Sequence, residues 1–305
     1  NKNRSSRSSG LAAAGIRKEV EIMESICLAN GVQMPLTGYG VFQITEENRC
    51  QQCVEEALAA GYRMIDTAAA YGNEAAVGRA VRASKIPREE LFVTTKLWVQ
   101  DAGYEETLRA FDVSMKKLGL DYLDLYLIHQ PFGDYYSAWR AMERLYREGA
   151  VRAVGVCNFL PERLVDLCMN QELRPMVNQI EIHPYFQQEE AIRITRSYGV
   201  VPEAWGPLFE GQRDIFHQKL LSGIAARHQK STAQVILRWH LQRQIPAILK
   251  TVHPERMREN LDILDFSLSE KEMEEIASLD TGHSEIIDHR NFCTARQLNS
   301  VKIHD

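Results

Sequence analysis

The sequence has little that would favour a membrane or a nucleic acid as a partner. None of its apolar runs approaches the roughly 18 residues that a membrane-spanning helix needs. Its 36 Lys and Arg residues are outnumbered by 41 Asp and Glu residues, which gives a net charge of −5 and a pI of about 6.0. A chain without surplus positive charge is poorly suited to neutralising phosphates. We therefore expect a cytoplasmic protein whose partner is a small molecule, with neither nucleic acid nor membrane as a partner.

Cysteine is also scarce, and its pattern predicts neither a disulfide framework nor a metal centre. Six cysteines in 305 residues are few for a disulfide-stabilised chain. Cys50 and Cys53 form a CxxC inside TEENRCQQCVEEALAAG (45–61), whose pattern is helical. No second Cys/His pair lies nearby in sequence to complete a zinc site. We interpret both thiols as lying on a helix surface or half-buried, and we expect no metal.

The first eighteen residues, NKNRSSRSSGLAAAGIRK, contain no acidic residue and carry five Lys and Arg residues. Such an Arg- and Ser-rich, acid-poor stretch resembles an organellar transit segment, although a truncated leader, an expression remnant or a flexible arm would have the same composition. We predict that residues 1–23 form a flexible basic arm and that residues 24–305 form one domain.

From about residue 25, short apolar runs alternate with amphipathic helical stretches. The strand candidates are 34–42, 62–67, 91–98, 123–130, 151–158, 176–182, 199–205 and 245–252, and the clearest helical stretches are 46–61, 104–119, 135–149, 160–170 and 231–244. Alternating strands and helices predict a parallel sheet with helical crossovers. Eight units, most spaced roughly 23–32 residues apart, fit a (β/α)8 TIM barrel. An open doubly wound sheet is the alternative, but no GxGxxG follows the first strand.

A hairpin precedes the first unit. The stretch SICLANGVQMP (25–35) places Asn30–Gly31 between two short β-branched or apolar runs. Asn-Gly is the preferred pair for a two-residue hairpin turn. We therefore expect an N-terminal β-hairpin ahead of the barrel, without a domain boundary after it.

Nearly every predicted strand ends in a polar residue. In chain order these ends carry Asp66 with Tyr71 in its loop, Lys96 followed by Trp98, His129, Cys157 with Asn158, Gln179, Trp205, and Lys250 with Thr251. Alone, His129 could be a hydrogen-bonded structural histidine, and Asp66 could cap the next segment. The C-terminal strand ends of a barrel meet on one face, however, and this face carries the active site. The polar residues together therefore indicate a site.

Asp66, Tyr71, Lys96 and His129 predict a general acid. A free tyrosine has a pKa near 10, which is too high for ready proton donation at neutral pH. We expect the Lys96 ammonium to lower the pKa of Tyr71, and Asp66 to hold Lys96 in place and charged. His129 would orient a carbonyl oxygen beside the phenol. An acid alone cannot reduce a carbonyl, so a cofactor must supply the hydride.

The stretch LKTVHPERMREN (249–260) is suited to binding such a cofactor. Lys250, Thr251 and Arg256 offer donors and positive charge for an adenosine 2′-phosphate, to which an arginine can bind bidentately. The alternative is an ordinary solvated helix start with mixed charges.

Three segments resemble signatures of the aldo-keto reductase family, and the resemblance extends from about residue 24 to the C-terminus. The segments are GYRMIDTAAAYGNEAAVG (61–78), MERLYREGAVRAVGVCNF (142–159) and ILKTVHPERMREN (248–260). Met64 and Leu249 stand where the family more often has other residues, Pro in the second case. The resemblance implies a (β/α)8 barrel that reduces aldehydes and ketones with NADPH, acts as a monomer, and uses Asp66, Tyr71, Lys96 and His129 as its catalytic tetrad.

The resemblance also implies roles for residues around this tetrad. Asn158 and Gln179 would bind the nicotinamide carboxamide, with Cys157 beside them where Ser is common. Trp205 would stack on the nicotinamide ring. The pyrophosphate and adenosine end would be lined by Leu208, Lys250, Thr251, Arg256 and Asn260, and the substrate pocket by Phe42, Trp98 and His129. Gln130 stands where Trp is common in the family. The loop PFGDYYSAW (131–139) is short, as in the bacterial branch that includes the 2,5-diketogluconic acid and methylglyoxal reductases. Both features imply an open substrate pocket with broad specificity.

Two other functions are compatible with such a scaffold. A sensor or structural protein could bind a nicotinamide cofactor with little turnover, although the complete tetrad argues against it. A barrel hydrolase using Asp66 and His129 would need a nucleophile or metal ligands, which the strand ends do not supply.

Overall fold

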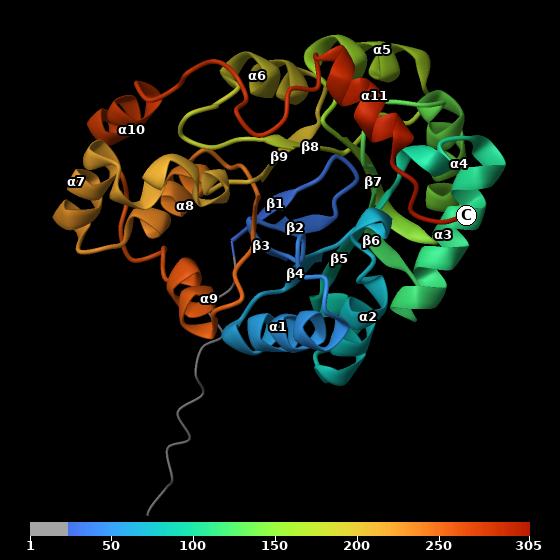
Figure 1. Cartoon of the computed structure of the whole chain (residues 1–305), viewed down its shortest axis with the longest axis horizontal. Coiled ribbons are helices and arrows are strands. Elements are labelled where there is room, and N and C mark those ends of the chain that lie inside the picture. The colour runs from blue at the N-terminus through green and yellow to red at the C-terminus, as the bar shows by residue number, and fades with distance from the viewer. Residues whose placement is uncertain (1–23) are drawn as a thin grey trace, which may run out of the picture.

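The computed structural model describes residues 24–305, so the predicted basic arm, 1–23, lies outside the described residues. Eight parallel strands close into a barrel in the order β10-β3-β4-β5-β6-β7-β8-β9 (Figure 1). They are β3 (Thr37–Gly40), β4 (Met64–Asp66), β5 (Phe92–Leu97), β6 (Leu123–Ile128), β7 (Val151–Cys157), β8 (Val177–Glu181), β9 (Val201–Trp205) and β10 (Ala247–Leu249). Each lies inside one of the eight predicted strand segments, so the predicted (β/α)8 barrel is confirmed.

The predicted N-terminal hairpin is also present, but its turn is one residue longer than expected. Strands β1 (Ser25–Cys27) and β2 (Gln33–Pro35) pair antiparallel as a separate sheet. Leu28 and Val32 are joined by a backbone hydrogen bond, and the Gly31 N–H donates to the Leu28 carbonyl, so the loop is Ala29–Gly31. Gly31 has φ of 89°, a left-handed conformation that ends such three-residue turns and favours glycine.

Helices surround the barrel. They are α1 (Glu47–Ala60), α2 (Glu74–Ala83), α3 (Tyr104–Leu118), α4 (Tyr135–Arg147), α5 (Pro161–Asn170), α6 (Glu189–Ser197), α7 (Lys219–His228), α8 (Thr232–Gln242), α9 (Pro254–Leu261), α10 (Glu270–Ala277) and α11 (Phe292–Ser300), with 3-10 turns η1 (Ala69–Tyr71), η2 (Arg88–Glu90), η3 (Val99–Asp101) and η4 (Phe209–His217). Glycines end α1 and α3: Gly61 and Gly119 have positive φ, and their N–H groups donate to carbonyls of the preceding turn. Gly149 follows one residue after the C-cap of α4.

The hydrophobic core has one part between the helices and the strands and another inside the barrel. The inner part includes Met64, Phe92, Leu125, Leu127, Val177 and Val201. Gly38 and Gly40 leave room for Ile248, since a β-carbon at either position would lie within 2.7 Å of its side chain. The prediction for Cys50 and Cys53 is wrong: both are completely buried between α1 and the barrel, near Tyr39.

The C-terminal segment, for which the sequence suggested no structure, returns to the mouth of the barrel. In Figure 1 it is the red segment that contains α11. The Trp98 Nε1–H donates to the Val301 carbonyl at 2.9 Å, and the Gln100 side chain bonds the Ile303 N–H and the His304 carbonyl. The loop after β5 therefore fixes the C-terminus. Over residues 24–305, none of the helices combines the length and the hydropathy of a membrane span.

Candidate active site

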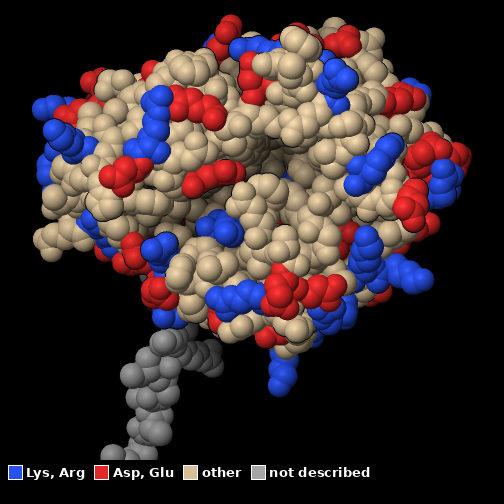
Figure 2. Space-filling view, viewed as in Figure 1, with Lys and Arg blue, Asp and Glu red and all other residues tan. Residues whose placement is uncertain are grey.

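A cavity of about 700 Å³ opens at the C-terminal ends of the barrel strands. Figure 2 shows it as a hollow whose visible walls are mainly uncharged, with Lys, Arg, Asp and Glu side chains around it. Of the predicted site residues, the cavity is lined by Phe42, Asp66, Tyr71, Trp98, His129, Asn158, Gln179, Trp205, Leu208, Lys250 and Arg256. Residues that are up to 214 positions apart in sequence, from Phe42 to Arg256, therefore meet at one site.

Lys96 joins Asp66 and Tyr71, which both line the cavity, but it does not line the cavity itself. Its Nζ lies 2.5 Å from Asp66 Oδ1, 3.1 Å from the Thr67 carbonyl oxygen and 3.5 Å from the Tyr71 hydroxyl. The Lys96 side chain is fully buried and the Asp66 side chain nearly so. Since an unpaired buried charge is costly, the two residues stabilise each other in their charged forms.

The electrostatic balance differs from the one expected from the sequence. Burial raises the pKa of Tyr71 to about 12, and the opposing effect of the Lys96 ammonium does not overcome it. The predicted net lowering of the Tyr71 pKa is therefore wrong. Burial acts to lower the pKa of Lys96, but the charge and hydrogen bond of Asp66, together with Tyr71 and Cys157, outweigh it, and the net pKa is raised. At neutral pH the site therefore holds a protonated phenol beside a charged ammonium.

His129 forms the side of the cavity next to Tyr71. Its ring packs edge-on against Tyr71 at 5.5 Å and against Trp98 at 5.3 Å between ring centroids. Burial, together with the positive charge of Lys96, holds the pKa of His129 well below its usual value. Among the described residues, none provides a hydrogen-bond partner for its Nδ1. The imidazole is neutral and can serve as a hydrogen-bond donor without adding charge.

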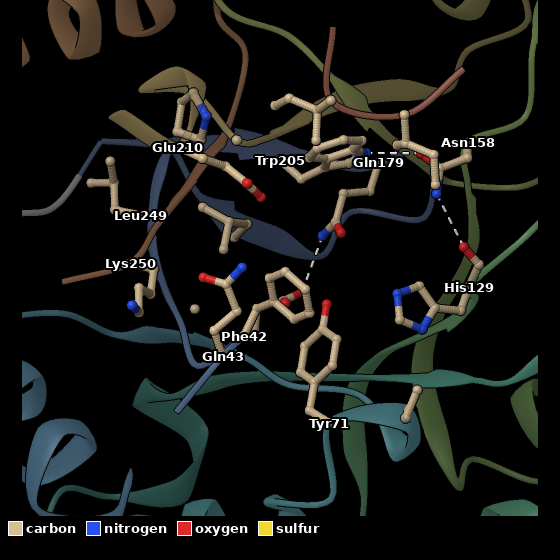
Figure 3. Close-up of a pocket in the computed structure, with 18 of the residues that line it drawn as sticks. Phe42, Gln43, Tyr71, His129, Asn158, Gln179, Trp205, Glu210, Leu249 and Lys250 are labelled. Atoms are coloured by element: carbon tan, nitrogen blue, oxygen red, sulfur yellow. Dashed lines mark hydrogen bonds between the residues drawn. The ribbon is translucent and has the colours of Figure 1, made fainter. Parts of the chain in front are cut away.

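Gln179, Asn158 and Trp205 form a hydrogen-bonded group opposite Tyr71 (Figure 3). The Trp205 Nε1–H donates to Asn158 Oδ1 at 2.8 Å, and Asn158 Nδ2 donates to the His129 carbonyl at 3.2 Å. Asn158 has φ of 60°, a left-handed conformation that asparagine tolerates better than most residues. Cys157 does not line the cavity; its buried Sγ lies 4.0 Å from Gln179 Oε1.

Lys250, Arg256 and Leu208 line the other end of the cavity, where both cationic side chains are exposed. Two residues predicted for this end lie elsewhere. Thr251 is buried, and its hydroxyl accepts from the His253 N–H. Asn260 is buried on α9 beside Tyr62. Neither of these two side chains is part of the cavity wall.

Several residues of the site were missed by sequence reasoning. Gln43 and Glu210 lie near Lys250 (Figure 3), and burial raises the pKa of Glu210. The C-terminal segment adds one wall of the cavity with Ile286, Ile287, His289, Leu298 and Val301. His289 Nε2 lies 2.9 Å from Gln130 Oε1, and burial lowers its pKa to about 4, so it is neutral. No spacing or motif in 281–305 pointed to this contact.

Within residues 24–305, the structure has no group of three or more His, Cys, Asp or Glu side chains placed to hold a metal ion. The cavity instead offers amide oxygens and an indole at one end and two cations at the other. Gln179 lines the cavity, and within residues 24–305 the Cys157 thiol, at 4.0 Å, is the one hydrogen-bond partner of its Oε1. This donor and acceptor set fits a nicotinamide nucleotide, with its amide at the neutral end and its phosphates at the cationic end.

Comparison with known proteins agrees with this geometry. The model of the Aldo/keto reductase family matches residues 36–281. Glyoxal reductase of Bacillus subtilis is 47% identical over 259 residues, which cover 85% of this chain and 93% of that protein. An aldo-keto reductase structure from a Medee basin deep-sea metagenome library is 44% identical with a TM-score of 0.85, and covers 88% of this chain and 99% of that one. A Bombyx mori aldo-keto reductase in complex with NADP is 33% identical with a TM-score of 0.83, over 87% of this chain and 95% of that one.

Proposed function

Because this chain belongs to the aldo/keto reductase family and is an oxidoreductase of carbonyl compounds, we propose that it reduces aldehydes and ketones with NADPH, and that Tyr71 donates the proton. The observation that carries the proposal is the contact of the fully buried Lys96 with both Asp66 and the Tyr71 hydroxyl at the bottom of the cavity. The bound cofactor would supply the hydride.

Tyr71 meets the requirements of a general acid in this setting. Its phenol is protonated at neutral pH, because its pKa is raised to about 12. As negative charge develops on a carbonyl oxygen, the phenol can donate to it, and the Lys96 ammonium stabilises the phenolate left behind. The neutral His129, on the edge of the Tyr71 ring, can donate a second hydrogen bond to the same oxygen. Asp66 keeps Lys96 charged and in place.

The residues at the two ends of the cavity would bind the cofactor. We assign Gln179 and Asn158 to the carboxamide, Trp205 to stacking on the nicotinamide ring, and Lys250 and Arg256 to the phosphates. The remaining wall, with Phe42, Trp98, His129 and His289, would contact the substrate. This wall combines aromatic rings with neutral polar groups, which suits small carbonyl compounds that carry further oxygen atoms, such as dicarbonyls.

Replacing Tyr71 by Phe tests this function. We expect carbonyl reduction, followed as NADPH oxidation with glyoxal, to fall by about 10²–10⁴-fold, the usual effect of losing a positioned general acid. NADPH affinity, measured by calorimetry, should change little because the hydroxyl lies outside the residues assigned to the cofactor. Tyr122→Phe is the matched control, since Tyr122 packs under Arg88 and does not line the cavity.

Two results would contradict the proposal. Activity retained in Tyr71→Phe would show that another group supplies the proton. A native protein that binds NADPH but does not oxidise it with any carbonyl compound would favour a cofactor-binding sensor on the same scaffold.

A further inference from the structure

Glu203 is a buried carboxyl group to which neither the barrel nor the general acid gives an obvious role. It lies on β9 inside the barrel and is 0% exposed. The strand register places Cys157, Gln179 and Glu203 side by side on β7, β8 and β9. Glu203 is therefore directly next to Gln179, which we assign to the cofactor. The Glu203 side chain itself does not line the cavity.

A single amide connects Glu203 to the catalytic ion pair. Gln179 Nε2 donates to Glu203 Oε2 at 2.9 Å and to Asp66 Oδ2 at 3.0 Å. Both hydrogens of the NH₂ group are thereby used, since it has only two. Gln179 is left with its Oε1 to present to the cavity. Glu203 and Asp66 together therefore fix which way the Gln179 amide faces.

The charges around Glu203 favour a proton on its carboxyl group. The titratable groups that face it are Asp66 from β4, Lys96 from β5 and Cys157 from β7. Lys96, which is paired with Asp66 at 2.5 Å, acts to lower the pKa of Glu203, whereas burial raises the pKa of Cys157, so its thiol is neutral. Burial, and after it the Asp66 carboxylate, raise the pKa of Glu203 to about 8. In the described structure, Glu203 Oε1 has no hydrogen-bond partner, and its charged form would be poorly solvated.

We propose that Glu203 is a positioning residue that holds the Gln179 amide with its Oε1 toward the cofactor, and that it loses its proton when the oxidised, cationic nicotinamide ring lies against that amide. This inference rests on the proposed function, which places the nicotinamide at Gln179. The reduced ring is neutral and the oxidised ring carries a positive charge. The carboxylate form of Glu203 therefore stabilises the oxidised cofactor, while the protonated form suits the reduced cofactor.

The sign of the pH dependence follows from this linkage. A cation stabilises the ionised carboxylate, so affinity for NADP⁺ increases as the pH rises through the pKa of Glu203. Affinity for NADPH lacks this increase. The ratio of the dissociation constants, Kd(NADP⁺)/Kd(NADPH), should therefore decrease between pH 7 and pH 9, and we expect a decrease of about three- to ten-fold.

The test measures both dissociation constants by calorimetry between pH 6.5 and 9.5 for the native protein and three variants. Glu203→Gln keeps an acceptor for Gln179 but cannot ionise, so it should bind both cofactors with near-native affinity at pH 7 and show a constant ratio. Glu203→Leu removes the acceptor and frees the Gln179 amide to rotate, so both affinities should fall about ten-fold, the effect of one hydrogen bond. Glu74→Gln is the control: Glu74 is equally buried but bonds Thr95 on the outer side of the barrel.

A second measurement needs no cofactor. Glu203 has a pKa of about 8 in the folded protein, whereas a glutamate in the unfolded chain has a pKa of about 4.3. Between these two pH values only the folded state holds the proton, so the free energy of unfolding decreases as the pH rises from about 4.3 to about 8. Glu203→Gln cannot ionise and so does not lose stability in this way. The difference in Tm between Glu203→Gln and the native protein should therefore increase by a few degrees, in favour of the variant, between pH 5 and pH 8.

The outcomes separate this inference from the proposed function. A native ratio that is constant between pH 7 and 9, or an equal decrease in Glu203→Gln, would overturn the proton linkage. Unchanged affinity in Glu203→Leu would overturn the positioning role. If neither cofactor binds the native protein, the proposed function fails instead, and a widening Tm gap would still show that Glu203 is held protonated.

Discussion

At the residue scale, burial and the charge of Lys96 act in opposite directions on the pKa of Tyr71. Lysine close to a phenol favours phenolate, but the same buried site that brings Lys96 to 3.5 Å also removes water from both groups. Burial has the larger effect, and the phenol remains protonated in the protein without ligands. In the proposed function, Lys96 would therefore act on the phenolate as it forms during proton transfer, where a preorganised charge is most effective.

This balance predicts the behaviour of Lys96→Met and Asp66→Asn. Each single change should lower kcat for carbonyl reduction, Lys96→Met by about 10²–10⁴-fold and Asp66→Asn by less, because the Lys96 amine remains next to Tyr71. Each also leaves one buried charge without its partner, which typically costs about 3–5 kcal/mol of stability. Steady-state kinetics and thermal unfolding measure the two effects separately.

The double variant Asp66→Asn/Lys96→Met distinguishes a catalytic role from a structural one. It removes both charges at once, so stability should recover toward the native value while activity stays low. Activity that recovers together with stability would mean that Lys96 only supports the fold.

At the element scale, the C-terminal segment is the part of the site that lies farthest from any recognisable motif. Helix α11 buries no residue fully, yet its Leu298 lines the cavity beside Val301. The segment is fixed by hydrogen bonds from Trp98 and Gln100, which lie in and next to the loop after β5. Contacts of this kind shape a pocket without contributing much to the stability of the barrel.

We therefore expect Leu298→Ala/Val301→Ala to affect substrate binding alone. KM for a small carbonyl compound should rise about three- to ten-fold, in keeping with the loss of buried apolar groups from a binding wall. The Kd for NADPH and the Tm should change little, since Lys250 and Arg256 lie at the other end of the cavity. Phe292→Ala is the control, because Phe292 lies on the same helix, is 79% exposed and does not line the cavity. An increase in the Kd for NADPH with an unchanged KM would place this wall on the cofactor instead.

At the scale of the whole molecule, the cavity is lined by residues from both halves of the chain. Gln43 and Tyr71 line the cavity from one side, and Trp205 and Glu210 from the other. A ligand that contacts both sides is expected to stabilise the whole fold.

NADPH should therefore raise the Tm of the protein more than NADH at equal concentration. A ligand present at 100 times its Kd stabilises the folded state by about 2.7 kcal/mol. In the proposed function, charge-assisted bonds from Lys250 and Arg256 to the 2′-phosphate would be worth about 1.5–3 kcal/mol each before allowance for their exposure. We expect a preference in affinity of about ten- to a thousand-fold.

Arg256→Ala should reduce the stabilisation by NADPH and leave that by NADH nearly unchanged, and higher salt should narrow the difference between the two cofactors. Arg258→Ala, exposed on the same helix but outside the cavity, is the control. Equal stabilisation by both cofactors in the native protein would show that this end of the cavity does not bind the 2′-phosphate.

The sequence by itself determined the barrel and the residues at its strand ends. Local periodicity sets each strand and helix, and the C-terminal ends of parallel strands meet on one face, so Asp66, Lys96 and His129 could be placed together without coordinates. The polar tip of a strand is a local signal. Glu203 could have been noticed in the same way, as a charged residue inside the apolar run 199–205.

Only the tertiary structure decided which of these residues face the cavity and what charge they carry. Thr251 and Asn260 turn away from it, and His289 joins it from a segment with no periodic pattern. The pKa values of Tyr71 and Glu203 depend first on how much water burial removes, and that of Glu203 depends next on the Asp66 carboxylate from another strand. Burial and contacts between distant segments arise from packing of the whole chain, so no local stretch of sequence contains them.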